Sequence, residues 1–316
     1  MPIHGWVNFD KPEGMTSTAA VGKIRLLFNA QKAGHAGTLD PLAQGILPIA
    51  LGEATKTVPF IMDAVKTYRF TVRWGLATTT DDREGDVLET SEHRPTDDDI
   101  EAVLGAFVGN ISQVPPAFSA IKIDGRRAYD MARAGEAPEI SARNVMIDRL
   151  SLVNRPNRDS AHFEVECGKG NYVRSLARDM AKKLGTLGHV SYLRRLRVGP
   201  FNEKNTIGLD ILDDLGHIAA EVDALDAVNT QLRPHLLPLQ TVLDDIPALP
   251  INEKEARDIR MGRAVIITAH VVDDKLSESH GAKQVLVLSD NHPVALGKLE
   301  EGRFQPVRVF NLSDIN

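Results

Sequence analysis

The chain has 316 residues, 42% of them apolar and 25% charged, which is ordinary for a soluble globular protein with room for one large and one smaller domain. The formal net charge of -6 and the pI near 5.9 argue mildly against a nucleic-acid partner. Cys167 is the only cysteine, which excludes an intrachain disulfide, and the sequence shows neither a membrane-spanning apolar run nor a secretion signal. We therefore expect a cytoplasmic protein.

The charges are segregated along the chain. Residues 180–202 carry five Lys and Arg and no acid, whereas residues 209–231 carry six Asp and Glu and no Lys or Arg. The two segments cancel in the sum, so one face of the molecule can stay positive despite the acidic total. Two ordinary solvated faces would give the same pattern.

Strands and helices are expected in an order that lacks a regular βαβ repeat. Residues 5–10 are typical of a strand, and a helix capped by Thr16 or Ser17 is predicted to run to Phe28. The Gly- and Pro-rich residues 32–52 are expected to be mostly loop. Further on, the pattern predicts strands over 67–75 and 161–167 and helices over 96–108 and 172–184. This order favours an α+β fold over a doubly wound one.

The C-terminal part of the chain has a different character. Four prolines between 233 and 250 indicate a linker, and residues 252–261 suit one helix. Short β-rich runs separated by turn residues follow at 264–272, 284–289, 293–299 and 304–310. We predict a main domain over 1–240 and a small β-barrel-like module over 244–316.

Several common chemistries lack their usual motifs in this sequence. It contains no Gly-x-x-x-x-Gly-Lys phosphate loop, no His-Glu-x-x-His and no Gly-x-Ser-x-Gly. Gly168-Lys169-Gly170 begins like a dinucleotide fingerprint, but Val173 stands where the third glycine is needed. These observations favour chemistry that a carboxylate, a tyrosine and an arginine perform unaided.

The most informative stretch is residues 34–48, which place Asp40 in a Gly-rich loop between apolar residues. Glycines let the backbone approach a ligand closely, and Pro41 stiffens the loop behind the carboxylate. On the Asp-Pro pair alone, the alternative is a turn that opens a helix.

The whole string resembles the catalytic motif of the TruB-type tRNA pseudouridine synthases, with the pattern Gly-His-x-Gly-Thr-Leu-Asp-Pro-x-Ala-x-Gly-x-Leu. In this resemblance Asp40 matches the catalytic aspartate, and His35 matches the histidine that lies against the displaced RNA loop. Lys11 and Pro12 match residues that support the active-site loop rather than react. Similar stretches span nearly the whole chain, at 9–17, 66–69, 75–85, 115–133, 167–175 and 192–195. Gly168, Asn171 and Phe118 depart from the usual residues of the family.

The resemblance implies a fold and an activity. The fold would be a pseudouridine-synthase domain with a mixed, largely antiparallel central sheet flanked by helices, a thumb-like RNA-binding insertion at about 117–145 and a C-terminal PUA-like barrel. The activity would be isomerisation of uridine 55 in the T-arm loop of tRNA, by base flipping and catalysis through Asp40. No cofactor and no metal is implied, the partner is tRNA, possibly including its acceptor end, and the protein would be a monomer.

The residue types suit this reaction. Asp40 would either attack C1′ as a nucleophile or remove a proton from C2′, and the sequence leaves both open. Arg174 would hold the carboxylate ionised, although a surface arginine at a helix start is the alternative. Tyr68 would offer a stacking face and a hydroxyl near C5, although its alternation with Phe70 also suits a core aromatic. The other pocket residues implied by the resemblance are Tyr172, Leu193, His35 and Asp82.

Basic residues in two segments are candidates for contacts to the RNA backbone. Those in the thumb and around the Leu-Arg-Arg stretch are Lys122, Arg126, Arg127, Arg133, Arg143, Arg194, Arg195 and Arg197.

Two other functions compete with the tRNA enzyme. The catalytic subunit of a guide-RNA complex, which resembles dyskerin, shares the Asp loop, but basic tails would be expected and this acidic chain has none. A tRNA-folding chaperone would act through RNA contacts alone. Asp40→Ala separates enzyme from chaperone, because only the isomerisation depends on the carboxylate.

Overall fold

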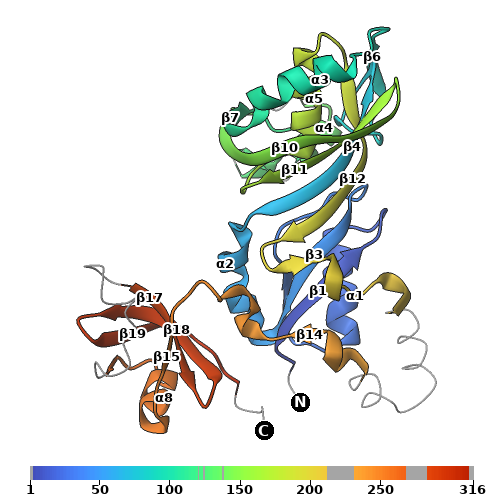
Figure 1. Ribbon diagram of the computed structural model, residues 1–316. Coiled ribbons are helices and arrows are strands. Elements are labelled where there is room, and N and C mark those ends of the chain that lie inside the picture. The colour runs from blue at the N-terminus through green and yellow to red at the C-terminus, as the bar shows by residue number, and fades with distance from the viewer. Residues whose placement is uncertain are drawn as a thin grey trace, which may run out of the picture.

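The computed structural model describes residues 3–119, 121–123, 125–136, 139–211, 231–267 and 283–312. A long central sheet runs through the larger part of the molecule, and a smaller curled sheet lies beside one end of it (Figure 1). Among the described helices, none combines the length and apolar character that crossing a bilayer requires.

The central sheet is mixed and largely antiparallel, as predicted. In spatial order its main strands are β14 (Leu236–Leu237), β1 (Gly5–Lys11), β3 (Gln44–Leu51), β12 (Gly188–Val198), β4 (Lys66–Trp74), β11 (Ser160–Cys167), β10 (Arg143–Asn157) and β7 (Gly109–Gln113). Two short strands, β2 (Ala33–His35) and β13 (Phe201–Asn202), pair with β3 and β12. Among the pairings described for this sheet, only that of β12 with β3 is parallel.

Helices flank the sheet and confirm the α+β prediction. The α-helices of this part are α1 (Ser17–Leu27), α2 (Val58–Met62), α3 (Asp97–Leu104) and α5 (Val173–Lys183). The short 3-10 helices are η1 (Gly52–Thr57), η2 (Gly105–Phe107) and η3 (Glu203–Asn205). Thr16 caps α1, since its hydroxyl accepts from the Ala19 amide, and Thr96 and Asp99 form a capping box on α3. The predicted helix over 96–108 is therefore α3 continued by the tighter turn η2.

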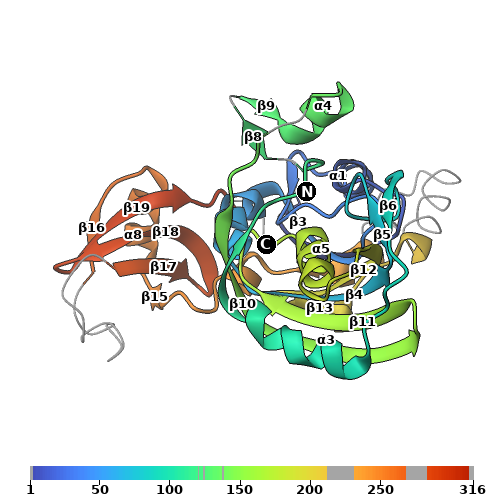
Figure 2. The same ribbon diagram turned by 90° about the horizontal axis from the view of Figure 1, so that it is seen from above.

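Two hydrophobic cores lie on opposite faces of the sheet. Alternate residues of β1 enter different cores, because successive strand side chains point to opposite faces: Val7 and Phe9 pack with α1, whereas Trp6 packs against Phe201. The first core continues under α3 and α5, which lie on the same side of the sheet and cover Phe163 (Figures 1 and 2). β1 and β3 are therefore buried on both faces, whereas β10, which lies under α3, keeps one face largely exposed.

The expectation that residues 32–52 are mostly loop was wrong. This segment contains β2 and β3, and only residues 36–43 between them are irregular. Seven of the eight residues of β3 are buried, so the strand reads as a continuous apolar run rather than an alternating one. Pro48 and the glycines masked this signal. The true loop is short and carries Asp40.

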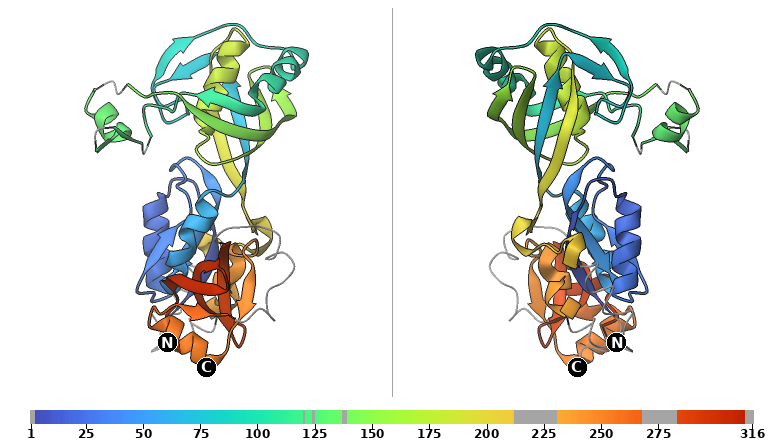
Figure 3. Two further views of the ribbon diagram at one scale, coloured as in Figure 1. Left: turned by 90° about the vertical axis from the view of Figure 1, so that its left-hand side faces the viewer. Right: turned by 90° about the vertical axis from the view of Figure 1, so that its right-hand side faces the viewer.

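Two hairpins project from the central sheet. One pairs β5 (Leu76–Thr78) with β6 (Val87–Thr90) and encloses the loop that carries Asp82. The other pairs β8 (Lys122–Ile123) with β9 (Arg126–Arg127) and leads into α4 (Ala128–Arg133). Figures 2 and 3 show this second hairpin and α4 standing away from the body of the molecule.

The C-terminal module is a curled, open sheet. Its strands are, in spatial order, β15 (Ala248–Pro250), β17 (Lys283–Ser289), β18 (His292–Glu300), β19 (Arg303–Val309) and β16 (Val265–Ile266), with α8 (Glu253–Arg260) packed on it. This matches the predicted small β module, although in the described residues its edge strands do not pair to close a barrel. Of the strand predicted over 264–272, residues 268–272 lie outside the described part of the chain.

Residues 233–250 were predicted to be a linker, but they form short structured elements that pack on the main domain. The segment forms η4 (Arg233–His235), β14 on the edge of β1 and η5 (Leu239–Val242). Leu239 and Leu243 are buried in the second core together with Phe310 from the C-terminal module. The prolines shape a segment that packs, rather than one that swings freely. The acidic residues 212–230 before it lie outside the described residues.

This shared core gives a stability prediction. Phe310 is 1% exposed and packs in the second core, so Phe310→Ala is expected to lower the free energy of unfolding by about 3–5 kcal/mol in urea titrations. Leu26→Ala is the control, because Leu26 is 80% exposed on α1, and its effect should stay within about 0.5 kcal/mol. Equal effects of the two substitutions would contradict a core shared between the modules.

Candidate active site

The Asp40 loop is fixed to the body of the protein by a buried serine. Ser17, at the start of α1, donates its hydroxyl to the Leu39 carbonyl and accepts from the Leu39 amide, both at 2.9 Å. The Gly14 amide donates to the Pro41 carbonyl at 2.8 Å, and the Ala43 amide donates to the Asp40 carbonyl at 3.1 Å. The backbone on both sides of Asp40 is therefore held in place before any ligand arrives.

Lys11 ties the same loop to the N-terminal turn. It is fully buried, and its ammonium donates to the carbonyls of Met15 at 2.7 Å, Pro12 at 2.9 Å and Pro41 at 3.4 Å. Burial lowers the pKa of Lys11 to about 8, although the carboxylate of Asp40 acts in the opposite direction. Lys11 and Pro12 thus lie beneath the loop, where the sequence prediction puts them.

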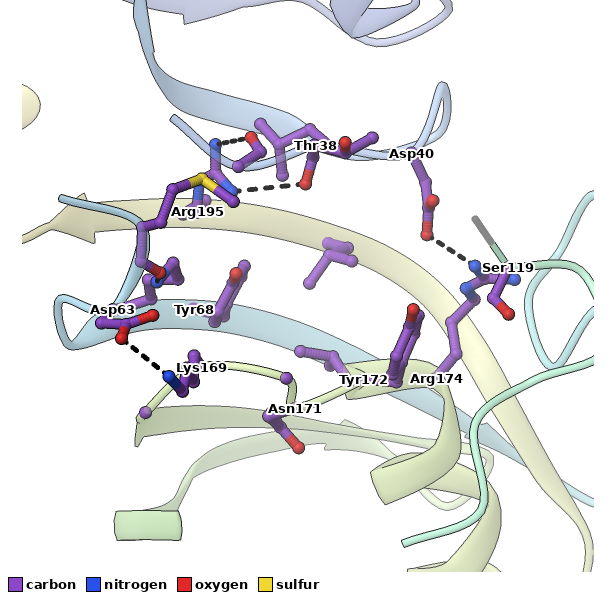
Figure 4. Close-up of a pocket in the computed structure, with 18 residues that line it drawn as sticks. Thr38, Asp40, Asp63, Tyr68, Ser119, Lys169, Asn171, Tyr172, Arg174 and Arg195 are labelled. Atoms are coloured by element: carbon purple, nitrogen blue, oxygen red, sulfur yellow. Dashed lines mark hydrogen bonds and ion pairs between the residues drawn. The ribbon is translucent and has the colours of Figure 1, made fainter. Parts of the chain in front are cut away.

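Asp40 and Arg174 form an ion pair at the mouth of a cavity (Figure 4). Their side chains approach to 2.9 Å, and the carboxylate is 37% exposed whereas the guanidinium is 5% exposed. Arg174 lies in the first turn of α5 and also donates to the carbonyls of Thr80 at 3.0 Å and Phe118 at 2.9 Å. The two carbonyls thus fix the guanidinium of Arg174, and its charge faces the carboxylate of Asp40 at the cavity.

Asp82 completes this cluster from the β5–β6 loop. It is 2% exposed, lies 3.4 Å from Arg174, and accepts from the Glu84 amide at 3.0 Å. One guanidinium therefore neutralises two carboxylates, of which only Asp40 lines the cavity. Asp82 lies where it can orient Arg174 without touching a ligand.

The cavity has a volume of about 350 Å³ and lies between the Asp40 loop, β4, β12 and the start of α5. Tyr68, Tyr172 and Leu193 line it, as predicted for a pocket. Figure 4 shows the two tyrosine rings between the Asp40–Arg174 pair at one end and Arg195 at the other. Flat aromatic faces between two polar ends suit a planar polar ring.

Tyr68 is partly buried, and desolvation raises the pKa of its phenol, so its hydroxyl stays protonated. It lies opposite Arg195 of β12, whose positive charge acts against this rise. Tyr68 thus lines the pocket and also packs against the hydrophobic core of the sheet. Both interpretations that the sequence left open, an active-site tyrosine and a core aromatic, therefore apply.

His35 does not line the cavity. It lies at the end of β2, and its Nδ1 is buried without a hydrogen-bond partner in the described residues. Burial, followed by the positive charge of Arg195, lowers its pKa, so the ring is neutral at pH 7. Its expected contact with a displaced RNA loop stays a prediction.

The basic residues predicted to contact RNA differ in their exposure and in their partners within the protein. Lys122, Arg127 and Arg133 are exposed on the projecting hairpin and α4, and Arg197 is exposed on β12. Arg143 is partly buried, with its guanidinium 5.2 Å from the centre of the Tyr172 ring. These positions leave the exposed four available for RNA and place Arg143 behind a pocket residue.

Three of the predicted RNA contacts are engaged within the protein. Arg126 makes a two-armed ion pair with Glu136 at 2.8 and 2.9 Å, and Arg194 makes one with Asp10 at 2.8 and 3.1 Å. Arg195 is 1% exposed and donates to backbone carbonyls, so the prediction of a surface phosphate contact was wrong for it. The sequence pattern shows a basic run, but strand alternation turns one of its members inward.

Comparison with known proteins identifies the family. The sequence model of the TruB family pseudouridylate synthase N-terminal domain matches residues 25–173, and that of the tRNA pseudouridylate synthase B C-terminal domain matches residues 174–244. The chain is 50% identical to tRNA pseudouridine synthase B of Caulobacter vibrioides over 98% of its own length and 97% of that protein. It belongs to the TruB family of pseudouridylate synthases. Another TruB relative, tRNA pseudouridine synthase B of Brucella anthropi, is 50% identical over 98% of this chain and 96% of that protein.

Two solved structures share the fold over almost the whole chain. A chain in the crystal structure of a Cbf5-Nop10-Gar1 complex matches with a TM-score of 0.69 and 27% identity, over 97% of this chain and 84% of that one. A chain in the archaeal box H/ACA sRNP Nop10-Cbf5 complex matches with a TM-score of 0.72 over 98% and 87%, and at 24% identity it shows the fold alone. The predicted family, enzyme class and fold are confirmed.

The sequence analysis missed Gln113, which shapes the site from the end of β7. Gln113 is 1% exposed, its side-chain oxygen accepts from the Tyr172 amide at 2.8 Å, and its Nε2 donates to the Tyr172 carbonyl at 3.2 Å. Nε2 also donates to Asn171 at 3.1 Å. It thus holds the peptide of a pocket tyrosine as a neighbouring strand would. Its place just before Pro115-Pro116 is the signal that could have drawn attention to it.

The buried Lys11 gives a pH prediction. Its folded pKa of about 8 lies below the 10.5 of an exposed lysine, so between these values the unfolded chain binds more protons. The free energy of unfolding of the wild type, minus that of Lys11→Met, should therefore rise as pH increases from about 8 to about 10.5. Denaturant titrations at several pH values measure this difference, in which the other lysines cancel. A difference that is flat or falls with pH would contradict the depressed pKa.

Proposed function

We propose that this TruB family protein isomerises uridine 55 in the T-arm loop of tRNA to pseudouridine, as a monomeric cytoplasmic enzyme that uses no cofactor. Asp40 is its essential carboxylate. In this proposal residues 1–240 form the catalytic domain and residues 244–316 an RNA-binding module. The observation that carries it is the half-exposed Asp40 at the mouth of the cavity, paired at 2.9 Å with the buried Arg174.

The reaction asks for what this cavity offers. Cleavage of the N1–C1′ bond leaves a detached uracil, which turns over and forms a C5–C1′ bond before the C5 proton leaves. Asp40 either attacks C1′ or removes the C2′ proton, and the ion pair with Arg174 orients it for both roles. No electron, phosphate or water is consumed, so the chemistry itself requires no cofactor.

The dimensions of the site favour an extruded nucleotide. A volume of about 350 Å³ is at the small end of ligand pockets and suits one nucleoside. The reacting atoms of a stacked uridine are inaccessible, so the nucleotide must leave the loop of the RNA to enter. Tyr68 and Tyr172 would lie against its base, since aromatic faces stack on bases with little sequence preference.

The choice of tRNA over a guide RNA complex rests on the relatives. Those at 50% identity are named tRNA pseudouridine synthase B, whereas the chains from the Cbf5 complexes are 24% and 27% identical. The exposed Lys122, Arg127 and Arg133 lie on the hairpin and α4 that project from the body, where they would contact the phosphates of a splayed T arm.

Mapping pseudouridine in tRNA tests the proposed target. Unmodified tRNA is incubated with the protein, treated with carbodiimide and read by primer extension. We expect one new stop, at the position that reports uridine 55, and none in the untreated control. A stop elsewhere would contradict the T-arm assignment, and the absence of any stop would contradict the activity.

Substitution of the carboxylate tests the mechanism. Asp40→Asn keeps the shape of the side chain but removes its charge, so the single-turnover rate of tritium release from C5-labelled uridine should fall more than about 1,000-fold. The affinity for tRNA should stay near the wild-type value. Asp98→Asn is the matched control, because Asp98 is exposed on α3 and outside the cavity. Retained turnover in Asp40→Asn would remove this residue from the mechanism.

A further inference from the structure

Arg195 closes the end of the cavity that lies opposite Asp40 and Arg174 (Figure 4). It is 1% exposed, and its guanidinium is held by the protein backbone. Nε donates to the Ile46 carbonyl at 2.7 Å, Nη2 to the Gly37 carbonyl at 3.0 Å and Nη1 to the Thr38 carbonyl at 3.4 Å. The side chain is thus fixed from three points and still lines the cavity.

Carboxylates neutralise the charge of Arg174, but no carboxylate in the described part of the chain pairs with Arg195. Arg174 faces the carboxylates of Asp40 and Asp82, whereas Arg195 forms no ion pair with any Asp or Glu of the described ranges. Its described hydrogen-bond partners are neutral carbonyls. A buried cation without a counter-ion is costly to keep, so its presence at a cavity calls for a reason.

The positive charge is felt by the groups around it. Burial is the first cause that lowers the pKa of Lys66 and of His35, and the charge of Arg195 is the second in both. Lys66 lines the cavity at the same end and is itself held by the carbonyls of Met62 at 3.0 Å and Ala64 at 2.7 Å. This end of the cavity therefore has a fixed positive potential, while the Asp40 end carries the carboxylate.

The proposed reaction generates a negative charge on the base. When the N1–C1′ bond breaks, its electron pair goes to the uracil, and the resulting anion spreads over N1, O2 and O4. The charge disappears when C5 bonds to C1′; the C5 proton then leaves to a base while N1 takes up a proton, which gives neutral pseudouridine. A fixed cation in a water-poor site lowers the energy of such a transient anion more than that of the neutral substrate or product.

We propose that Arg195, together with the Tyr68 hydroxyl, is a catalytic residue that binds the detached uracil anion. The inference rests on the proposed function. The ribose would lie at the Asp40 end and the base would extend between Tyr68 and Tyr172, so that its carbonyl oxygens reach the Arg195 end. A guanidinium has five N–H groups, of which the three described carbonyls occupy three. Two N–H groups are therefore left for the base.

The alternative is that Arg195 only anchors the Asp40 loop. A substrate with a better leaving group distinguishes the anchoring role from the anion-binding role. Fluorine at C5 provides one, because it withdraws electrons and so stabilises the uracil anion by itself. tRNA is assembled with either uridine or 5-fluorouridine at the target position. Loss of the N-glycoside at that position is followed under single-turnover conditions by nuclease digestion and mass spectrometry. An anchor acts on both substrates equally, whereas an anion-binding group matters less for the fluorinated one.

Arg195→Met removes the charge and keeps the length of the side chain. We expect cleavage at uridine to fall about 100-fold or more, the usual loss when a charge-stabilising donor is removed from an active site. At 5-fluorouridine the loss should be smaller by about tenfold. Arg195→Lys, which keeps the charge but not the fork, should show the same trend with smaller losses, and it decides the question if the Met variant fails to fold.

Arg69→Lys is the matched control, because Arg69 follows Tyr68 on β4 but is exposed and paired with Glu164 at 3.0 Å. It should leave both substrates unaffected. Equal losses on the two substrates, or no loss in the Arg195 variants, would overturn the proposal while the wild type still forms pseudouridine. A wild type inactive on both substrates would instead contradict the proposed function.

Discussion

The structure depends on the parallel contact between β12 and β3, which joins the two halves of the central sheet. At this contact Arg195 lies opposite Gly45 on one side and Tyr68 of β4 on the other. A side chain at Gly45 would meet the Arg195 carbonyl at 2.3 Å, and its φ of +101° also requires glycine. The close approach brings the loop that precedes β3 over the tyrosine of β4, so the cavity exists because these strands pair.

Around this contact the protein separates its charges. Arg174 collects two carboxylates at one end of the cavity, and Arg195 keeps its charge at the other. The acidic total of the chain hides this arrangement, because net charge sums over the whole surface while a reaction responds to the field inside one pocket. The weak argument that the composition made against an RNA partner fails for the same reason.

Local patterns predicted much of the fold and the members of the cavity. The sequence correctly predicted the cap of α1, the alternating pattern of β4 and the length of α5. The predicted pocket residues also line one cavity, and they are Asp40, Tyr68, Arg174, Tyr172 and Leu193. β3 was hidden because glycine and proline outweighed a buried apolar run. The burial of Arg195 and the hydrogen bonds of Gln113 to Tyr172 were not predictable from local patterns. Both depend on contacts between residues that are distant in sequence.

The core shared by the two modules has a consequence for the choice of substrate. Lys56 of η1 donates to the Val309 carbonyl at 2.7 Å, and Arg308 donates to the Lys56 carbonyl at 3.1 Å, close to α2, whose end supplies Met62 to the cavity. The curled sheet is therefore joined by direct contacts to the segment that borders the cavity. If RNA binds both the cavity and the C-terminal module, as proposed, the distance between its two contact points is constrained, which would exclude loops of suitable sequence carried on stems of the wrong length.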